Sequence, residues 1–294
     1  MKKQNQAYVY AACAVLFWST VASAFKISLG YMTSLDLVLY SSLVSSIFLF
    51  AVLAAGNKLK LLFSYSLRDY IQSALLGFLN PFLYYAVLFK AYSLLPAQTA
   101  QPLNWTWPLM LVLLSVPMLK QKIGPKNIIA IIISFIGVLI ISTQGNFLSL
   151  NFSNRTGVIL ALGSSVIWAL FWIYNIKDRR DETAKLFLNF SFGFGYTLAA
   201  IMCFSTVKIP EFRGFAGAVY VGLFEMGLAF IVWMKALSMS KTTALVGNLI
   251  YMAPFLSLIV IYFVLGEKIH FSTVIGLIFI ISGILFQQYV SRKS

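Results

Sequence analysis

Long apolar stretches follow one another along the whole chain, separated by short loops in which the polar residues gather. A helix needs roughly 20 mainly apolar residues to cross the hydrocarbon core of a bilayer. No loop is long enough to form a separate soluble domain. The pattern predicts an all-α polytopic membrane protein with ten transmembrane helices, at 8–29, 35–55, 70–92, 97–119, 126–143, 156–176, 185–206, 215–238, 242–265 and 273–290.

Composition and charge support this fold class and set an orientation. The chain is 60% hydrophobic and 10% charged, whereas soluble domains carry about 25% charged residues. The net charge of +14 lies in the loops, so it predicts no nucleic-acid partner. With the N-terminus inside, 16 of the 22 Lys and Arg residues fall on the inner side and the other 6 on the outer side. The positive-inside rule therefore places both termini in the cytoplasm.

The two halves of the chain repeat each other. FKAYS at 89–93 matches MKALS at 234–238, and Gly137 lies in a segment that matches the one around Gly283. We therefore expect two five-helix repeats, 1–146 and 147–294. Because five is odd, the second repeat must enter the bilayer inverted, and inverted repeats are typical of transporters with a site between them. A matched first helix also favours a retained transmembrane segment over a cleaved signal peptide.

The segment QPLNWTWPLM at 101–110 holds residues that a lipid-facing helix does not need. Pro102 and Pro108 each remove a backbone hydrogen bond. Gln101, Asn104 and Trp107 are spaced to share one helix face. We predict that these three line a substrate cavity and that Pro108 is a hinge; the alternative is that the amides only join helices, at about 1 kcal/mol each.

The corresponding segment of the second half, 246–254, repeats the order of asparagine, aromatic residue and proline. We predict that Asn248 and Tyr251 belong to the same site, with Gly247 and Pro254 as further hinges. Costly residues at two symmetry-related places are harder to explain by packing alone.

Glu225 is the one acidic residue predicted in the middle of a helix. Ionisable residues inside membranes usually mark functional sites. Glu225 could hold a proton or bind a substrate ammonium group; the alternative is a neutral acid that joins two helices. Its counterpart in the first half is Asn80, which precedes Pro81. We therefore predict Asn80 as a second site residue and Pro81 as a hinge.

Aromatic residues deep in predicted helices complete the candidate site. Trp168 and Trp172 share a helix face, and with Trp18 and Tyr84 they could form an aromatic wall. Plain packing explains an aromatic stripe nearly as well. Lys26 and Lys235 lie close to helix ends, where a lysine usually extends to the interface.

Several motifs resemble the drug/metabolite transporter superfamily, EamA type. These are the two five-helix halves, the tryptophan early in each half and Gly266-Glu267-Lys268 at the end of the ninth helix. Asn104-Trp105-Thr106-Trp107-Pro108 is similar to a motif of the aromatic amino acid exporter branch, as is the segment 167–180. In contrast, 120–122 departs from the family's usual Gly-Glu. The resemblance implies a cavity among helices 1, 3, 4, 6, 8 and 9, peripheral helices 5 and 10, and a bacterial inner-membrane exporter.

We therefore predict an exporter of small organic metabolites, most of all aromatic or other hydrophobic amino acids, working by alternating access. A passive facilitator and a carrier of another metabolite or a lipid-linked group remain alternatives. An enzyme is not expected, since the single histidine, His270, cannot form a zinc site of the H-E-x-x-H type. The predicted partners are a small-molecule substrate, the lipid bilayer and, as a candidate, protons, with no cofactor and no metal, in a monomer or homodimer.

Overall fold

The structure, a computed structural model, describes residues 2–119, 124–146, 154–175, 177–240 and 248–291. Every regular element in these ranges is helical. The first half contains α1 (Lys2–Ser28), α2 (Ser34–Ala55), α3 (Lys60–Ser64), α4 (Leu67–Gly77), η1 (Phe78–Leu83), α5 (Tyr84–Leu94), α6 (Ala97–Asn104), α7 (Trp107–Leu119) and α8 (Pro125–Ser142). The second half contains α9 (Arg155–Asn175), α10 (Glu182–Phe204), α11 (Phe212–Tyr220), η2 (Val221–Leu228), α12 (Ala229–Met239), η3 (Asn248–Met252), α14 (Ala253–Leu265) and α15 (Phe271–Ser291).

The described helices confirm an all-helical membrane protein. Eight of them are long and apolar enough to cross a membrane, counting α4–η1–α5 and α11–η2–α12 as one span each, and Leu249–Leu265 is a shorter apolar helix. The predicted span 97–119 is wrong as a single helix, because α6 ends at Asn104 and α7 begins at Trp107. Pro108 explains the break: it has no N–H for a bond to the carbonyl four residues earlier, but it fits the first turn of a new helix.

Interruptions occur at corresponding places in the two halves. The third span contains the π-helical segment η1, and the eighth contains the π-helical segment η2. The fourth span is broken between α6 and α7, and the described part of the ninth span starts with the 3-10 turn η3. Structure and sequence therefore repeat together.

The pair α8 and α15 displays the two-fold relation most directly. A Cβ added to Gly137 of α8 would collide with Gly276 of α15, and one added to Gly283 of α15 would collide with Ala130 of α8. Gly283 lies 146 positions after Gly137, and Gly276 lies 146 positions after Ala130. The two contacts are therefore mates across one pseudo-two-fold axis.

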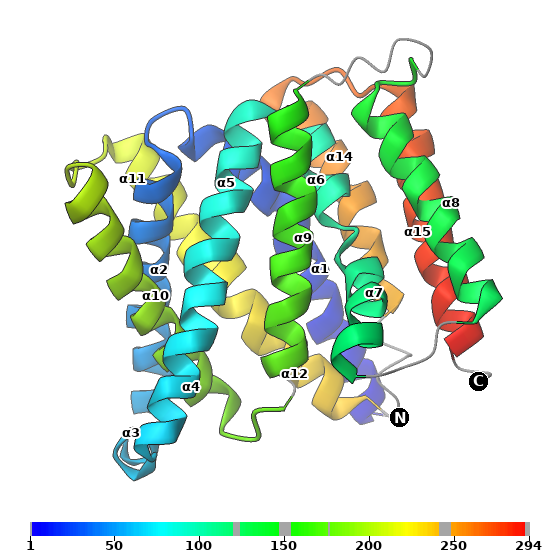
Figure 1. Cartoon of the computed structure of the whole chain (residues 1–294). Coiled ribbons are helices and arrows are strands. Elements are labelled where there is room, and N and C mark those ends of the chain that lie inside the picture. Colours follow the sequence, from blue (N-terminus) through cyan, green and yellow to red (C-terminus); the bar gives the residue numbers. More distant parts are fainter. Residues whose placement is uncertain (1, 120–123, 147–153, 176, 241–247, 292–294) are drawn as a thin grey trace.

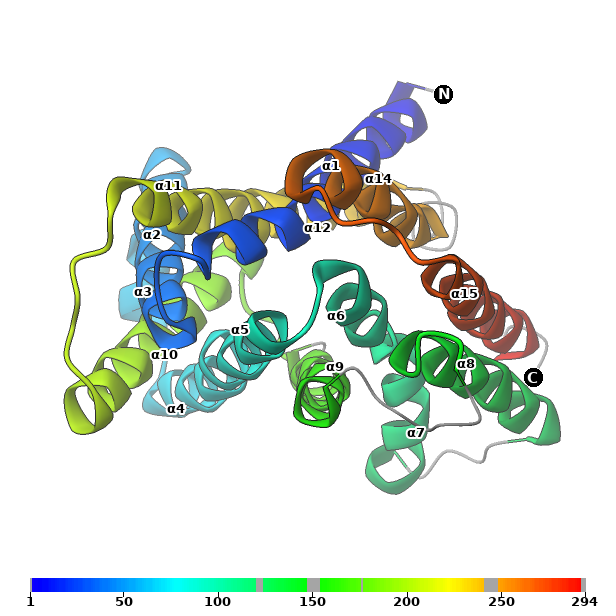
Figure 2. The ribbon, with the colours of Figure 1, turned by 90° about the horizontal axis from the view of Figure 1, so that it is seen from above.

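The helices form two rows (Figures 1 and 2). In Figure 2, α1, α12 and α14 lie on one side of the centre, and α5, α6 and α9 lie on the other. Helices α2 and α10 pack together at one end, and α8 pairs with α15 at the other. The predicted peripheral helices, 5 and 10, are α8 and α15.

A buried ion pair anchors the connection between α9 and α10. Arg180 contacts Asp178 at 2.6 Å and also donates to the Asp69 carbonyl and the Ser73 hydroxyl of α4, each at 2.9 Å. Burial disfavours the charged carboxylate of Asp178, but hydrogen bonds from Arg180 outweigh this effect and lower the pKa of Asp178. The cluster ties this loop to the first half of the chain.

The close approach of α8 and α15 predicts a sharp effect of one methyl group. Gly137→Ala places a Cβ against the Gly276 carbonyl, and such overpacking costs about 1–3 kcal/mol. The unfolding temperature of the purified protein in detergent should fall. Gly163→Ala in α9 is the matched control, because nothing lies within 4 Å of its added Cβ. Equal unfolding temperatures for the two variants would contradict this packing.

Candidate functional site

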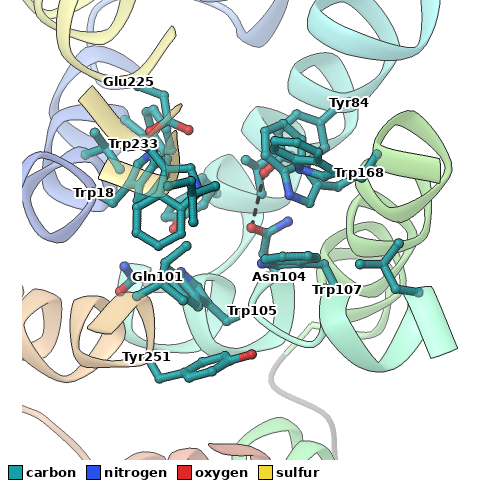
Figure 3. Close-up of a pocket in the computed structure, with 18 of the residues that line it drawn as sticks. Trp18, Tyr84, Gln101, Asn104, Trp105, Trp107, Trp168, Glu225, Trp233 and Tyr251 are labelled. Carbon is teal, nitrogen blue, oxygen red and sulfur yellow. Dashed lines mark hydrogen bonds between the residues drawn. The ribbon is translucent and has the colours of Figure 1, made fainter. Parts of the chain in front are cut away.

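One cavity of about 470 Å³ lies between the two halves of the chain. Its walls come from the six predicted helices, 1, 3, 4, 6, 8 and 9, together with one residue of α15 (Figure 3). The lining residues are Trp18, Val21, Phe25, Tyr84, Leu88, Tyr92, Gln101, Asn104, Trp105, Trp107, Leu111, Trp168, Trp172, Glu225, Trp233, Leu237, Ile250, Tyr251 and Gln288. The volume falls in the range of small-molecule sites, about 300–1,000 Å³.

Nine of the 19 lining residues are tryptophan or tyrosine. Trp168 lies 4.5 Å from Tyr84 and 5.9 Å from Trp172, between ring centroids. Across the cavity, Trp18 and Trp233 meet edge to face at 5.5 Å. Ring pairs at these distances stabilise one another by about 0.5–1.5 kcal/mol each. These contacts favour a wall that is formed before a ligand binds.

The π-helical segment η2 positions the acid of the site. Glu225 lies in its middle, and another part of η2 packs on α2. Gly222 approaches the Ser41 carbonyl, and the Ser45 hydroxyl donates to the Met226 carbonyl at 3.0 Å. Single π-helical turns inside α-helices frequently occur at functional sites. Here the turn is held by α2 while Glu225 faces the cavity.

The Glu225 carboxyl group is buried, at 6% exposure, and only half engaged. Its Oε1 atom lies 3.0 Å from the hydroxyl of Tyr85, which is positioned to donate to it. Its Oε2 atom has no hydrogen-bond partner in the part of the chain that the structure describes. One carboxyl oxygen is therefore both buried and unpaired among the described residues.

The two amides of α6 differ in their engagement. Asn104 accepts from the Tyr84 hydroxyl at 3.2 Å and donates to the Ser164 hydroxyl at 2.8 Å. Gln101 is 2% exposed, and neither its oxygen nor its nitrogen has a partner among the described residues. Asn104 thus joins three helices, whereas both polar atoms of Gln101 are buried and unpaired within the described part of the chain.

Helix α15 contributes to the cavity through Gln288, although helix 10 was predicted as peripheral. The Gln288 amide nitrogen donates to the Tyr251 hydroxyl, which links α15 to η3. Tyr251 is therefore a cavity residue whose hydroxyl is already engaged.

The start of α6 is fastened to the loop between α14 and α15. The Glu267 carboxylate accepts from the backbone N–H groups of Ala97 at 2.8 Å and Gln98 at 3.2 Å. The Gln98 side chain donates to the Lys268 carbonyl and accepts from the His270 N–H, each at 2.9 Å. The acid satisfies backbone donors that the beginning of a helix leaves open.

The ammonium group of Lys26 is bound at the end of a neighbouring helix. It donates to the carbonyls of Tyr92 and Leu95, both at 2.7 Å, and so caps the end of α5. The end of a helix leaves carbonyl groups open, which a buried cation satisfies well. Lys235 instead lies over the Tyr10 ring, 4.8 Å from its centroid.

The structure places most of the predicted site residues on the cavity wall and some elsewhere. Those on the wall are Trp18, Tyr84, Gln101, Asn104, Trp107, Trp168, Trp172, Glu225 and Tyr251. Asn80 was predicted in the site, but the structure does not place it on the cavity wall. It is fully buried in η1, which packs on α10. Pro81 of η1 contacts Gly193 there.

The predicted hinges have different surroundings. Pro108 and Pro254 lie in the first turns of α7 and α14, directly after the two interruptions. Gly247 and the side chain of Asn248 lie outside the described residues. The prediction that residues 104 and 107 share one continuous helix face is wrong, since the chain breaks between them, yet both line the cavity.

Ten lining residues were not assigned to the site from sequence: Val21, Phe25, Leu88, Tyr92, Trp105, Leu111, Trp233, Leu237, Ile250 and Gln288. The repeat contained a usable signal for four of them. In the alignment of FKAYS with MKALS, Leu88 corresponds to Trp233 and Tyr92 to Leu237. Both members of each pair face the cavity.

A helical membrane protein with a cavity between two matched halves has the architecture of a transporter. The model of the EamA-like transporter family matches residues 5–143 and 155–287, so the chain belongs to this family. The predicted superfamily and the absence of an enzymatic class are thereby confirmed. The repeat boundary at 146 stays a prediction.

Individual relatives agree with this assignment. An uncharacterized transporter of Clostridium kluyveri is 26% identical and covers 99% of this chain and 95% of its own. The aromatic amino acid exporter YddG of Ancylobacter novellus is 24% identical, covering 86% and 87%. A solved crystal structure has a TM-score of 0.65 at 19% identity and covers 98% of both chains, which supports the fold. These matches show the family, and they do not assign the chain to the exporter branch.

The contrast between the two amides gives a stability prediction. Asn104→Leu removes the partners of two buried hydroxyls and should lower the free energy of unfolding by about 1 kcal/mol. Gln101→Met removes an unpaired amide of similar size and should not lower stability. Unfolding temperatures in detergent compare the two variants. A larger loss for Gln101→Met would show that its amide has a structural role.

Proposed function

We propose that the chain exports small amphipathic organic metabolites by alternating access around the central cavity, with aromatic and other hydrophobic amino acids as the first candidates. The observation that carries the proposal is a buried carboxyl group with one free oxygen, set in an aromatic cavity between the two repeats. Transporters with inverted repeats bind substrate at this place. The relative named as an aromatic amino acid exporter adds support for the substrate class.

Interrupted helices provide the points at which the cavity walls can move. Helix α6 contributes Gln101 and Asn104 and ends at the break before α7, while η3 contributes Tyr251 just before α14. Discontinuous helices at the site are typical of alternating-access transporters. We propose Pro108 and Pro254 as bending points, because each begins a new helix beside the cavity.

Glu225 is proposed to bind either a substrate ammonium group or a proton. A carboxyl group buried among rings loses hydration, so its charged form needs a positive partner. The free Oε2 atom can receive such a partner. If one site serves both, substrate and proton would compete for it.

We propose a bacterial inner membrane with both chain termini on the cytoplasmic side. Helix α1 begins and α15 ends at the same end of the bundle. The excess of Lys and Arg on the loops of that end supports the orientation.

Counterflow in liposomes tests the proposal. Liposomes that hold the purified protein and are preloaded with unlabelled amino acid should accumulate the labelled compound. Glu225→Gln should reduce the rate of accumulation about tenfold or more, since it removes a charge-assisted bond. Glu211→Gln is the control, because Glu211 is exposed at the start of α11. A stimulation by a pH gradient that disappears in Glu225→Gln would assign the proton.

Unchanged transport in Glu225→Gln would contradict the role of this residue. Counterflow that a pH gradient does not stimulate would favour a passive facilitator. If no amino acid is exchanged by folded protein, the search moves to other metabolites and to lipid-linked groups.

A further inference from the structure

We infer that the substrate is an organic cation with an aromatic or apolar body and no carboxylate. This inference rests on the proposed transport function. It keeps the amphipathic metabolite with an ammonium group but excludes the carboxylate, so it puts amines in place of amino acids as the first candidates. Among the described residues that line the cavity, Glu225 is the only Asp, Glu, Lys, Arg or His. A bound monocation would neutralise it, whereas a zwitterion would add a second negative charge.

Two basic residues that are close in sequence to lining residues are engaged elsewhere. Lys26 follows the lining residue Phe25, but its ammonium group is bound by two carbonyls at the end of α5. Lys235 lies between the lining residues Trp233 and Leu237 in sequence, but its ammonium group lies over the Tyr10 ring. Neither cation is directed to a carboxylate in the cavity.

The aromatic wall suits a cation in a second, independent way. The faces of tryptophan and tyrosine rings attract cations, most strongly in desolvated sites, and quaternary ammonium groups are bound in such aromatic cages. Figure 3 shows Glu225 on the side of Trp18 and Trp233, with Trp168 and Tyr84 across the cavity. A cation between them would meet rings on both sides and the free carboxyl oxygen.

Neutral donors are present, and they indicate what the rest of the substrate offers. The side-chain nitrogens of Gln101 and Trp172 are buried without a partner among the described residues. These groups can donate to a hydroxyl, carbonyl or ring nitrogen. An ionised carboxylate would lose more hydration than two neutral donors restore, because buried charges require charged or multiple partners.

Matched pairs of compounds that differ only in the carboxylate provide the test. The probes are phenylalanine against phenethylamine and its N,N,N-trimethyl derivative, which is permanently charged and does not leak through lipid. Affinity is measured on purified protein by quenching of tryptophan fluorescence, and exchange is measured by counterflow in liposomes at neutral pH. We expect the affinity for the two cations to be about tenfold higher than that for phenylalanine, or more. We also expect both cations to be exchanged in counterflow.

Variants separate charge recognition from general loss of function. Glu225→Gln should lose the preference for the cations while keeping the unfolding temperature, and Glu211→Gln should retain it. Phenylalanine bound and exchanged as well as the cations would overturn the inference and leave the transport function standing. No exchange of any probe by folded wild-type protein would overturn both. A preference unchanged in Glu225→Gln would also overturn the inference.

Discussion

The need to satisfy every backbone polar group inside a bilayer governs this structure. Irregular backbone at membrane depth is tolerated only where protein or a cavity covers it. The chain interrupts its helices at η1, η2, η3 and between α6 and α7, and the segments at all four places pack on other helices. Side chains supply the replacement bonds: the Thr106 hydroxyl donates to the Leu103 carbonyl, and the Ser45 hydroxyl donates to the Met226 carbonyl. The interruptions and the cavity thus depend on each other.

Sequence could predict much of the fold because apolar length and the placement of charges are local properties. Residues that are costly in lipid, such as Asn104 and Glu225, could also be found, since few positions other than a cavity or a buried contact accept them. Asn80 was misplaced for a physical reason. The match with Glu225 predicts the depth of Asn80 in the membrane, but it does not predict the direction of its side chain from a π-helical turn. Segment η1 packs on α10.

The net charge of the whole chain is positive, whereas the cavity wall carries an acidic residue. The chain carries a formal net charge of +14, yet the chargeable acid on the described cavity wall is Glu225. The surplus of cations serves the orientation of helices and the capping of their ends, as Lys26 does for α5. The overall sign of the protein is therefore a poor guide to the sign of what it binds.

The fastening of α6 by Glu267 and Gln98 determines which parts travel as one body. Four hydrogen bonds join the first turn of α6 to residues 267–270, and α15 starts directly afterwards and interlocks with α8 through the contacts of Gly137 and Gly283. A tilt of α6 that keeps these bonds must carry α15, and with it α8. The pair α8 and α15 would then move together with the cavity wall. Its friction with the surrounding lipid would contribute to the rate of every transport cycle.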